Sequence, residues 1–201
     1  MGFWGASAGG SAADGSGDGK LRVASYISNQ WNYLDRWFFL FDTSSIGTGQ
    51  QVDSATLGIV LRKITSDPGF GLSWNVYSSN PASNTALVAA DHSTLGAVPF
   101  STARVVNDES TSFTRVDFAL NTAGKNAVDM EGISKFGAAT IQDRENATYG
   151  DPTWVNASEW RQDAYFSDFS GTANDPLLTV THSAVATGSP HYYSSSIQGA
   201  I

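Results

Sequence analysis

Apolar and polar residues alternate along several short stretches of the chain, and this period of two predicts β-strands. The predicted strands are residues 21–27, 36–41, 52–64, 72–77, 113–120, 136–141, 164–167 and 177–182. A short helix is predicted at residues 123–130, because Asn121 and Thr122 can cap its start and Gly132 can end it. About eight strands without strand–helix alternation predict an all-β fold, an antiparallel two-sheet jelly-roll sandwich with one short helix.

The densest apolar run, residues 37–41, is predicted to be a central strand of this sandwich. Five bulky side chains in a row indicate a strand buried on both faces, since a half-exposed strand would alternate with polar residues. We expect Arg36 and Asp42 to mark the points where this strand leaves the apolar interior. In the next strand, alternation predicts that Ala55, Leu57, Ile59 and Leu61 share one face.

The two ends of the chain differ from its middle. Residues 1–20 and 184–201 are rich in Gly, Ser and Ala, a composition that cannot bury enough apolar surface to fold alone. We therefore expect one domain, residues 21–183, with two extended arms. Apolar side chains on such arms are best explained by a partner subunit that buries them. These assembly candidates are Phe3, Trp4, Tyr192, Tyr193, Ile197 and Ile201.

Composition excludes several functions. The 201 residues carry a net charge of −8, and the 11 Lys and Arg residues are scattered, whereas nucleic-acid binding needs clustered cations. The chain has no cysteine, so disulfides and thiolate chemistry are excluded. No apolar run approaches the ~20 residues that span a bilayer. The first residues show no signal peptide, which leaves both cytoplasmic synthesis and removal of a signal open.

Residues suited to catalysis are present without a recognisable motif. His92, His182 and His191 lack metal-ligand spacing, and no Gly-x-Ser-x-Gly motif marks a nucleophile. Asp151, Glu159 and Asp163 occur close to Trp154 and Trp160 in the sequence, as the carboxylates of a sugar-hydrolysing site would. A solvated loop explains the same residues more simply, and we expect a protein that is not an enzyme.

No cofactor is expected, although Asp42, Asp53 and Asp175 stand at predicted strand ends, where a structural Ca²⁺ would find oxygen ligands. Capping of turns by the same carboxylates explains them without an ion. The polar connection over residues 143–161 carries Tyr149, Trp154 and Trp160, which could stack on sugar rings or anchor a protein interface. The alternative is that one or more of these rings packs against the sandwich core.

Several segments together resemble the DNRLRE-type sandwich modules of bacterial extracellular proteins and bacteriophage structural proteins. The resemblance lies in Arg36 with the following residues 38–46, in Val52 with residues 54–57, and in the closing residues 175–181. It spans residues 21–183 and leaves both arms outside. It implies the sandwich fold and the short helix, and it implies attachment to enzymes, polysaccharide binding or a place in a virion. It brings no catalytic residues.

These observations predict a structural protein of a bacteriophage-like virion, either a capsid decoration protein or a tail-associated protein. Its partners would be other virion subunits or copies of itself, without nucleic acid or membrane insertion. The alternative is a secreted, extracellular carbohydrate-binding or adhesion module that recognises a cell-surface polysaccharide.

Overall fold

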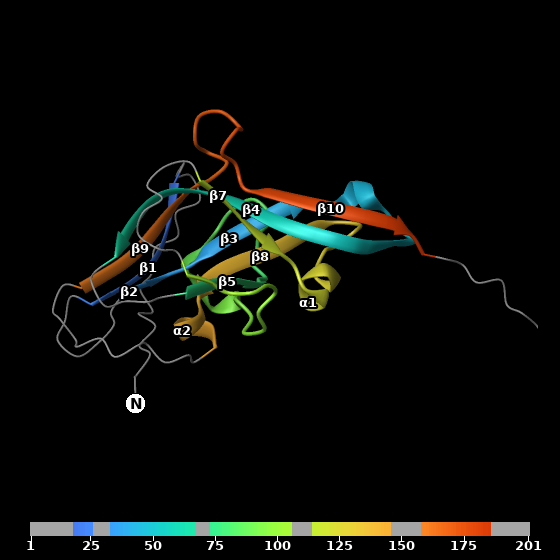
Figure 1. The fold of residues 1–201 in the computed structure, drawn as a ribbon. Helices are drawn as coiled ribbons and strands as arrows, with labels where there is room; N and C mark the ends of the chain where they lie inside the picture. The colour runs from blue at the N-terminus through green and yellow to red at the C-terminus, as the bar shows by residue number, and fades with distance from the viewer. Residues whose placement is uncertain (1–17, 26–32, 67–72, 106–113, 146–157, 186–201) are drawn as a thin grey trace, which may run out of the picture.

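The computed structural model describes residues 18–25, 33–66, 73–105, 114–145 and 158–185, and the structural statements below refer to these residues. Within them, two antiparallel sheets pack against each other (Figure 1). The chain crosses between the sheets repeatedly, for example from β3 to β4 and from β4 to β5, as in a jelly roll. The predicted all-β, antiparallel sandwich is therefore confirmed.

The larger sheet contains β1 (Asp18–Ser25), β2 (Tyr33–Asp35), β4 (Gln50–Ser66), β7 (Thr114–Ala119), β9 (Ser158–Tyr165) and β10 (Leu177–Ala184). The smaller sheet contains β3 (Trp37–Asp42), β5 (Ser73–Ser78), β6 (Arg104–Val105) and β8 (Ile133–Thr140). The helical turns are η1 (Ser44–Ile46), η2 (Ala89–Thr94), α1 (Thr122–Asn126) and α2 (Ile141–Arg144). The sequence predicted one short helix, which corresponds to α1, and it missed α2 and both 3₁₀ turns.

β9 and β10 occupy the same edge of the long strand β4. Leu61 of β4 pairs with Thr114 of β7 and also with Ala164 of β9, so β7 and β9 lie on opposite edges. Leu57 pairs with Phe118 of β7 and also with Leu178 of β10, so β10 lies on the β9 side. The chain leaves this edge after β9 and returns to it as β10, and residues 166–176 form the orange loop that projects in Figure 1.

The core lies between the sheets and is rich in tryptophan. Trp37 and Trp74 meet edge to face with ring centroids 5.2 Å apart, and both belong to the same buried cluster as Trp160. The predicted inward face of β4 is confirmed, because Ala55, Leu57, Ile59 and Leu61 all lie in that cluster.

The apolar run of β3 forms an edge strand of the smaller sheet and not a central strand. Its inner face contributes Trp37 and Phe39 to the core, while Phe38 packs on the outer face against a second cluster of Tyr77, Leu95 and Ala139. Loop residues such as Leu95 thus cover the outer face of this sheet, which explains why the run shows no alternation.

Arg36 does not mark an exit to solvent, which corrects that prediction. Its guanidinium donates to both carboxylate oxygens of Asp143 at 2.7 and 2.8 Å, and the two side chains are only 7% and 8% exposed. It also donates to the carbonyl of His92. The pair therefore ties the start of β3 to α2. Asp42, in contrast, is exposed as expected.

Candidate functional site

A β-bulge in the β4–β10 ladder defines the first part of the candidate site. The pairing runs from Ser54 with Thr181 to Val52 with His182, so Asp53 is an extra residue on β4 without a partner on β10. A bulge of this kind redirects a side chain, disrupts the ladder locally and increases the local twist. The Asp53 carboxylate accepts hydrogen bonds from Gln51 Nε2 at 3.3 Å and from Ser183 Oγ at 3.0 Å.

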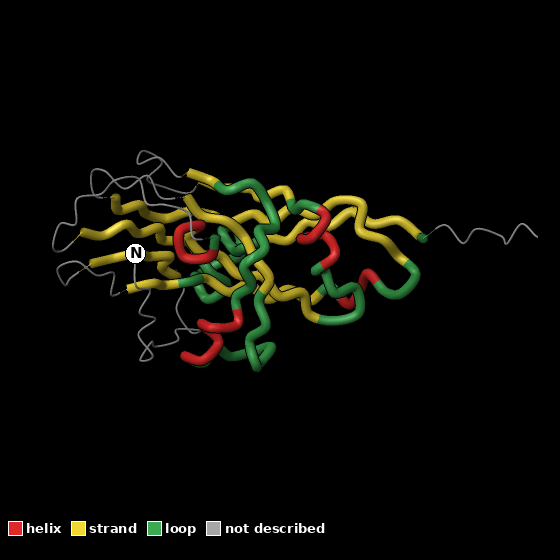
Figure 2. Tube along the Cα trace, turned by 90° about the horizontal axis from the view of Figure 1, so that it is seen from below, coloured by secondary structure: helices red, strands yellow, loops and turns green. Residues whose placement is uncertain are grey.

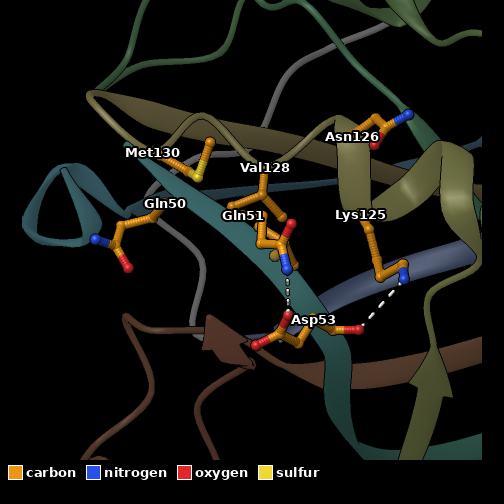
Figure 3. A pocket seen from close by; sticks show the side chains of 8 residues that line it. Gln50, Gln51, Asp53, Lys125, Asn126, Val128 and Met130 are labelled. Carbon is orange, nitrogen blue, oxygen red and sulfur yellow. Dashed lines mark hydrogen bonds between the residues drawn. The ribbon is translucent and has the colours of Figure 1, made fainter. Parts of the chain in front are cut away.

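Beside this bulge lies an open groove of about 650 Å³ between the start of β4 and the segment that follows α1 (Figure 3). Asn121 positions that segment, because its side chain accepts a hydrogen bond from Gly124 N at 3.0 Å and caps α1. The predicted cap is thus confirmed, although α1 ends earlier than predicted. The groove residues are Gln50, Gln51, Val52, Asp53, Lys125, Asn126, Val128 and Met130.

The groove has a polar rim over apolar side chains. Lys125 Nζ donates to the Asp53 carbonyl at 3.2 Å, and the rim also carries the amides of Gln50, Gln51 and Asn126. Val128 is buried at one side. Asp53 is the single carboxylate in the lining and no aromatic ring contributes to it. The described lining therefore provides neither a carboxylate pair for glycoside hydrolysis nor a stacking platform for a sugar.

The three aspartates proposed for Ca²⁺ do not converge. Asp42 accepts hydrogen bonds from Ser44 Oγ at 2.6 Å and Ser44 N at 3.0 Å, which form a turn just before η1 and lower the pKa of the carboxyl. Asp53 lies beside the Lys125 ammonium, and Asp175 precedes the opposite end of β10, roughly 20 Å along the strand. Among the described residues no cluster of three His, Asp or Glu side chains could hold a metal.

The predicted aromatic platform loses Trp160, because this residue lies in the core. This residue lies in β9, is 1% exposed and belongs to the core cluster, so its ring is not available to a ligand. The predicted polar connection therefore ends before β9, earlier than expected. Tyr149 and Trp154 lie outside the described residues.

Two of the three carboxylates proposed for sugar hydrolysis, Glu159 and Asp163, lie near arginine side chains. Asp163 is buried and binds the guanidinium of Arg161, and Glu159 faces Arg22 at 4.0 Å. Asp151 lies outside the described residues. Asp163 thus serves an ion pair within the sheet.

The histidines are separated in the structure. Half-buried His92 has Nε2 3.0 Å from the Leu34 carbonyl, and burial together with the nearby Arg36 lowers its pKa. Exposed His182 contacts Gln50 through Nδ1 at 3.1 Å. His191 and all six assembly candidates, Phe3, Trp4, Tyr192, Tyr193, Ile197 and Ile201, lie outside the described residues.

The feature that sequence reasoning missed is the outer edge of β10. No described strand pairs with β10 on the side away from β4, and in Figure 1 it forms the upper rim of the molecule. Both views show β4 and β10 running out together toward one end, where the described chain stops at Val185 (Figures 1 and 2). Alternation marked β10 as a strand, but an edge is a property of pairing and has no signature in one strand's sequence.

Comparisons with known proteins identify no family for this chain. No protein-family model matches it, and no curated protein matches it. A search of solved structures returned the infectious bursal disease virus VP2 subviral particle, with 13% identity and a TM-score of 0.20 over 85% of this chain. The aligned part is 38% of that viral chain. The fold assignment therefore rests on the observed sheets, and the function on the chain's own surfaces. No described helix is long and apolar enough to cross a membrane.

Proposed function

We propose that this protein is a non-enzymatic structural subunit of a bacteriophage-like virion, as a capsid decoration or tail-associated protein. The observation that carries the proposal is the uncharged, exposed edge of β10 on an otherwise acidic protein. Exposed strand edges are sites where one chain adds to another. The edge also continues directly into the C-terminal arm, so one end of the sandwich offers two means of assembly.

Several charged groups that the structure describes are held in contacts within the fold. The groove at Asp53 holds one carboxylate, and Asp53 is bonded to Gln51 and Lys125 of the same lining. The buried charged groups Arg36, Asp143 and Asp163 are held in ion pairs that connect structural elements. These pairs serve packing within the fold, whereas β10 presents an edge that pairs with no further described strand.

Incorporation into particles tests this role. The full chain and a variant lacking residues 1–16, which leaves β1 complete, are each co-expressed with the particle proteins of the source genome. We expect both to show the same far-ultraviolet circular dichroism and cooperative unfolding, and only the full chain to co-sediment with particles. Normal incorporation of the truncated chain would show that the N-terminal arm is not an assembly element. Absence of the full chain from particles would contradict the virion role.

A secreted carbohydrate-binding module is the second candidate, because the groove presents amide side chains that can bond to sugar hydroxyls. A glycan array tests it with Asn126→Ala in the groove and with Trp154→Ala from the sequence prediction. A sugar signal that either substitution abolishes would favour this role over the virion role. A matched Asn84→Ala variant, changed at an exposed amide outside the groove lining, should leave such a signal intact.

A further inference from the structure

The edge of β10 lacks the devices by which proteins normally prevent strand edges from pairing. Such edges are blunted by Lys, by inward-pointing charges, by Pro or by bulges on the edge strand itself. Residues 177–185 contain no Lys, Arg, Asp, Glu or Pro. The bulge in the β4–β10 ladder, between Thr181 and His182, places its extra residue at Asp53 on β4 and not on β10. Thr179, Val180 and Thr181 also have high β-propensity.

The other edges of the two sheets differ from β10 in this respect. β7 carries the exposed charges Arg115 and Asp117, and β2 is only three residues long. β3 begins next to Arg36 and ends at the exposed Asp42. Among the described edge strands, β10 is therefore the one that combines length with a complete absence of charge.

Two exposed apolar residues specify a register for a partner strand. Leu177 at the start of β10 is 53% exposed, and Val185 just after its end is 48% exposed. If a second β10 pairs antiparallel about a twofold axis at Thr181, Leu177 of each copy lies opposite Val185 of the other. The same register places Leu178 opposite Ala184, Thr179 opposite Ser183, and Thr181 opposite itself. Val180 lies opposite His182 in this register. In the other pairs apolar residues meet apolar residues and hydroxyls meet hydroxyls, which are favourable cross-strand pairs.

We propose that two copies of this chain pair antiparallel along the outer edges of β10, with the twofold axis at Thr181. This joins the two larger sheets into one continuous sheet across the dimer. The inference rests on the proposed assembly role and names the partner at this surface, a second copy.

Charge and composition favour a second copy over other occupants. Two chains that each carry a net charge of −8 repel each other, and an uncharged edge is where they can approach with least repulsion. A straight continuation of β1 before Asp18 would also run along β10, because β1 pairs with β9 on the same side. Residues 9–17 contain only Gly, Ser, Ala and Asp, however, and Gly, Asp and Ala are depleted in strands.

Single cysteine substitutions test the register, because the chain contains no cysteine of its own. Thr181 residues of the two copies would lie about 5 Å apart between Cα atoms, within the range of a disulfide. Thr179 residues would lie about 13 Å apart, which is too far. We therefore expect Thr181→Cys to form a covalent dimer under mild oxidation and the matched Thr179→Cys to remain monomeric. Combining Leu177→Cys with Val185→Cys should restore dimer formation, while Leu177→Cys alone should not.

A charge substitution tests the same pairing without oxidation. Thr181→Lys places two ammonium groups at the axis and should weaken the dimer by at least about tenfold in light scattering across a concentration series. Thr102→Lys makes the same charge change at an exposed threonine away from β10 and should leave the dimer unchanged. Thermal unfolding of each variant shows that the fold is retained.

The outcomes separate this inference from the virion role. Cross-linking through Thr181→Cys that persists after removal of residues 1–16 supports pairing between β10 strands, even where particle incorporation fails. The pairing is refuted if folded Thr181→Cys protein gives no covalent dimer, as when the chain's own N-terminal arm or another partner covers the edge. Equal cross-linking at positions 179 and 181 would indicate chance collisions and would also overturn it. A chain that enters particles without such a dimer retains its virion role and loses this interface.

Discussion

Replacement of Asp143 by Asn is expected to destabilise the fold strongly, because it leaves the Arg36 guanidinium buried without its counter-charge. The two side chains are 7% and 8% exposed and share two short hydrogen bonds. Removal of one partner from a buried pair costs about 3–5 kcal/mol. Arg144 adds to this cost, since burial and the positive charge of Arg36 already lower its pKa and Asp143 offsets that repulsion.

Urea unfolding measures this cost, with the change in midpoint converted through the slope of the transition. For a chain of this size, about 4 kcal/mol corresponds to a decrease in Tm of roughly 8–16 °C. Asp35→Asn is the matched control, because Asp35 binds Arg22 at the same 2.7 Å but the two side chains are 34% and 20% exposed. We expect that more exposed pair to contribute about 0.2–1 kcal/mol.

The double substitution Arg36→Met with Asp143→Leu replaces the whole ion pair and serves as a second control. An apolar pair of similar volume removes both charges and should recover much of the stability lost in Asp143→Asn. The reasoning is refuted if Asp143→Asn costs no more than Asp35→Asn. The pair would then be solvated, and α2 would not be held on the sandwich by a buried charge.

Three further changes test other contacts. Burial and Arg36 hold the pKa of His92 below 6.5, so the unfolded chain takes up a proton at a higher pH than the folded chain. The free energy of unfolding therefore falls as pH decreases from about 7 to about 5, and His92→Gln should flatten this dependence in urea unfolding. Backbone N–H groups of Val88 and Ala82 lower the pKa of the Asp91 carboxyl, so its stabilisation is present at neutral pH and lost in acid. Asp91→Ala should therefore lower stability clearly at pH 7 and much less at low pH. Gly137→Ala should cost about 1–3 kcal/mol in the same assay, since its Cβ would meet the Leu95 side chain and lie 2.9 Å from the Trp37 carbonyl. An unchanged pH dependence in His92→Gln, or a cost within error in either of the other two variants, would contradict the contact concerned.

Alternation in the sequence predicted the strands well where one face of a strand is apolar, as in β4 and β7. It failed for β9, where the pattern places Trp160 and Ala164 in the core but also Gln162, which is fully buried. A polar residue at a core position breaks the signal, so the predicted strand began only at residue 164. β2 and β6 have three and two residues and are too short for any period to be detected.

The candidate site was less predictable than the fold, because it arises from pairing between distant segments. Asp53 was noted as a carboxylate at a strand end, but its role as the extra residue of a bulge depends on the register with β10, some 130 residues later. Arg36 and Asp143 are separated by 107 positions, and no local pattern connects them. Trp160 was assigned to a possible surface platform, because the sequence around an aromatic residue in a polar stretch does not show whether its side chain faces solvent or the core.

The exposed edge of β10 follows from the way the chain uses β4. β9 is covered on its far side by β1, whose first residue Asp18 pairs with the last residue of β9, Tyr165. The chain then leaves the sheet and returns as β10 further along the same edge of β4, beyond the end of β1. The uncovered edge therefore lies between Asp18, the first residue of β1, and Val185, the last residue of the described segment. A strand that pairs with β10 would extend the larger sheet without displacing any described strand.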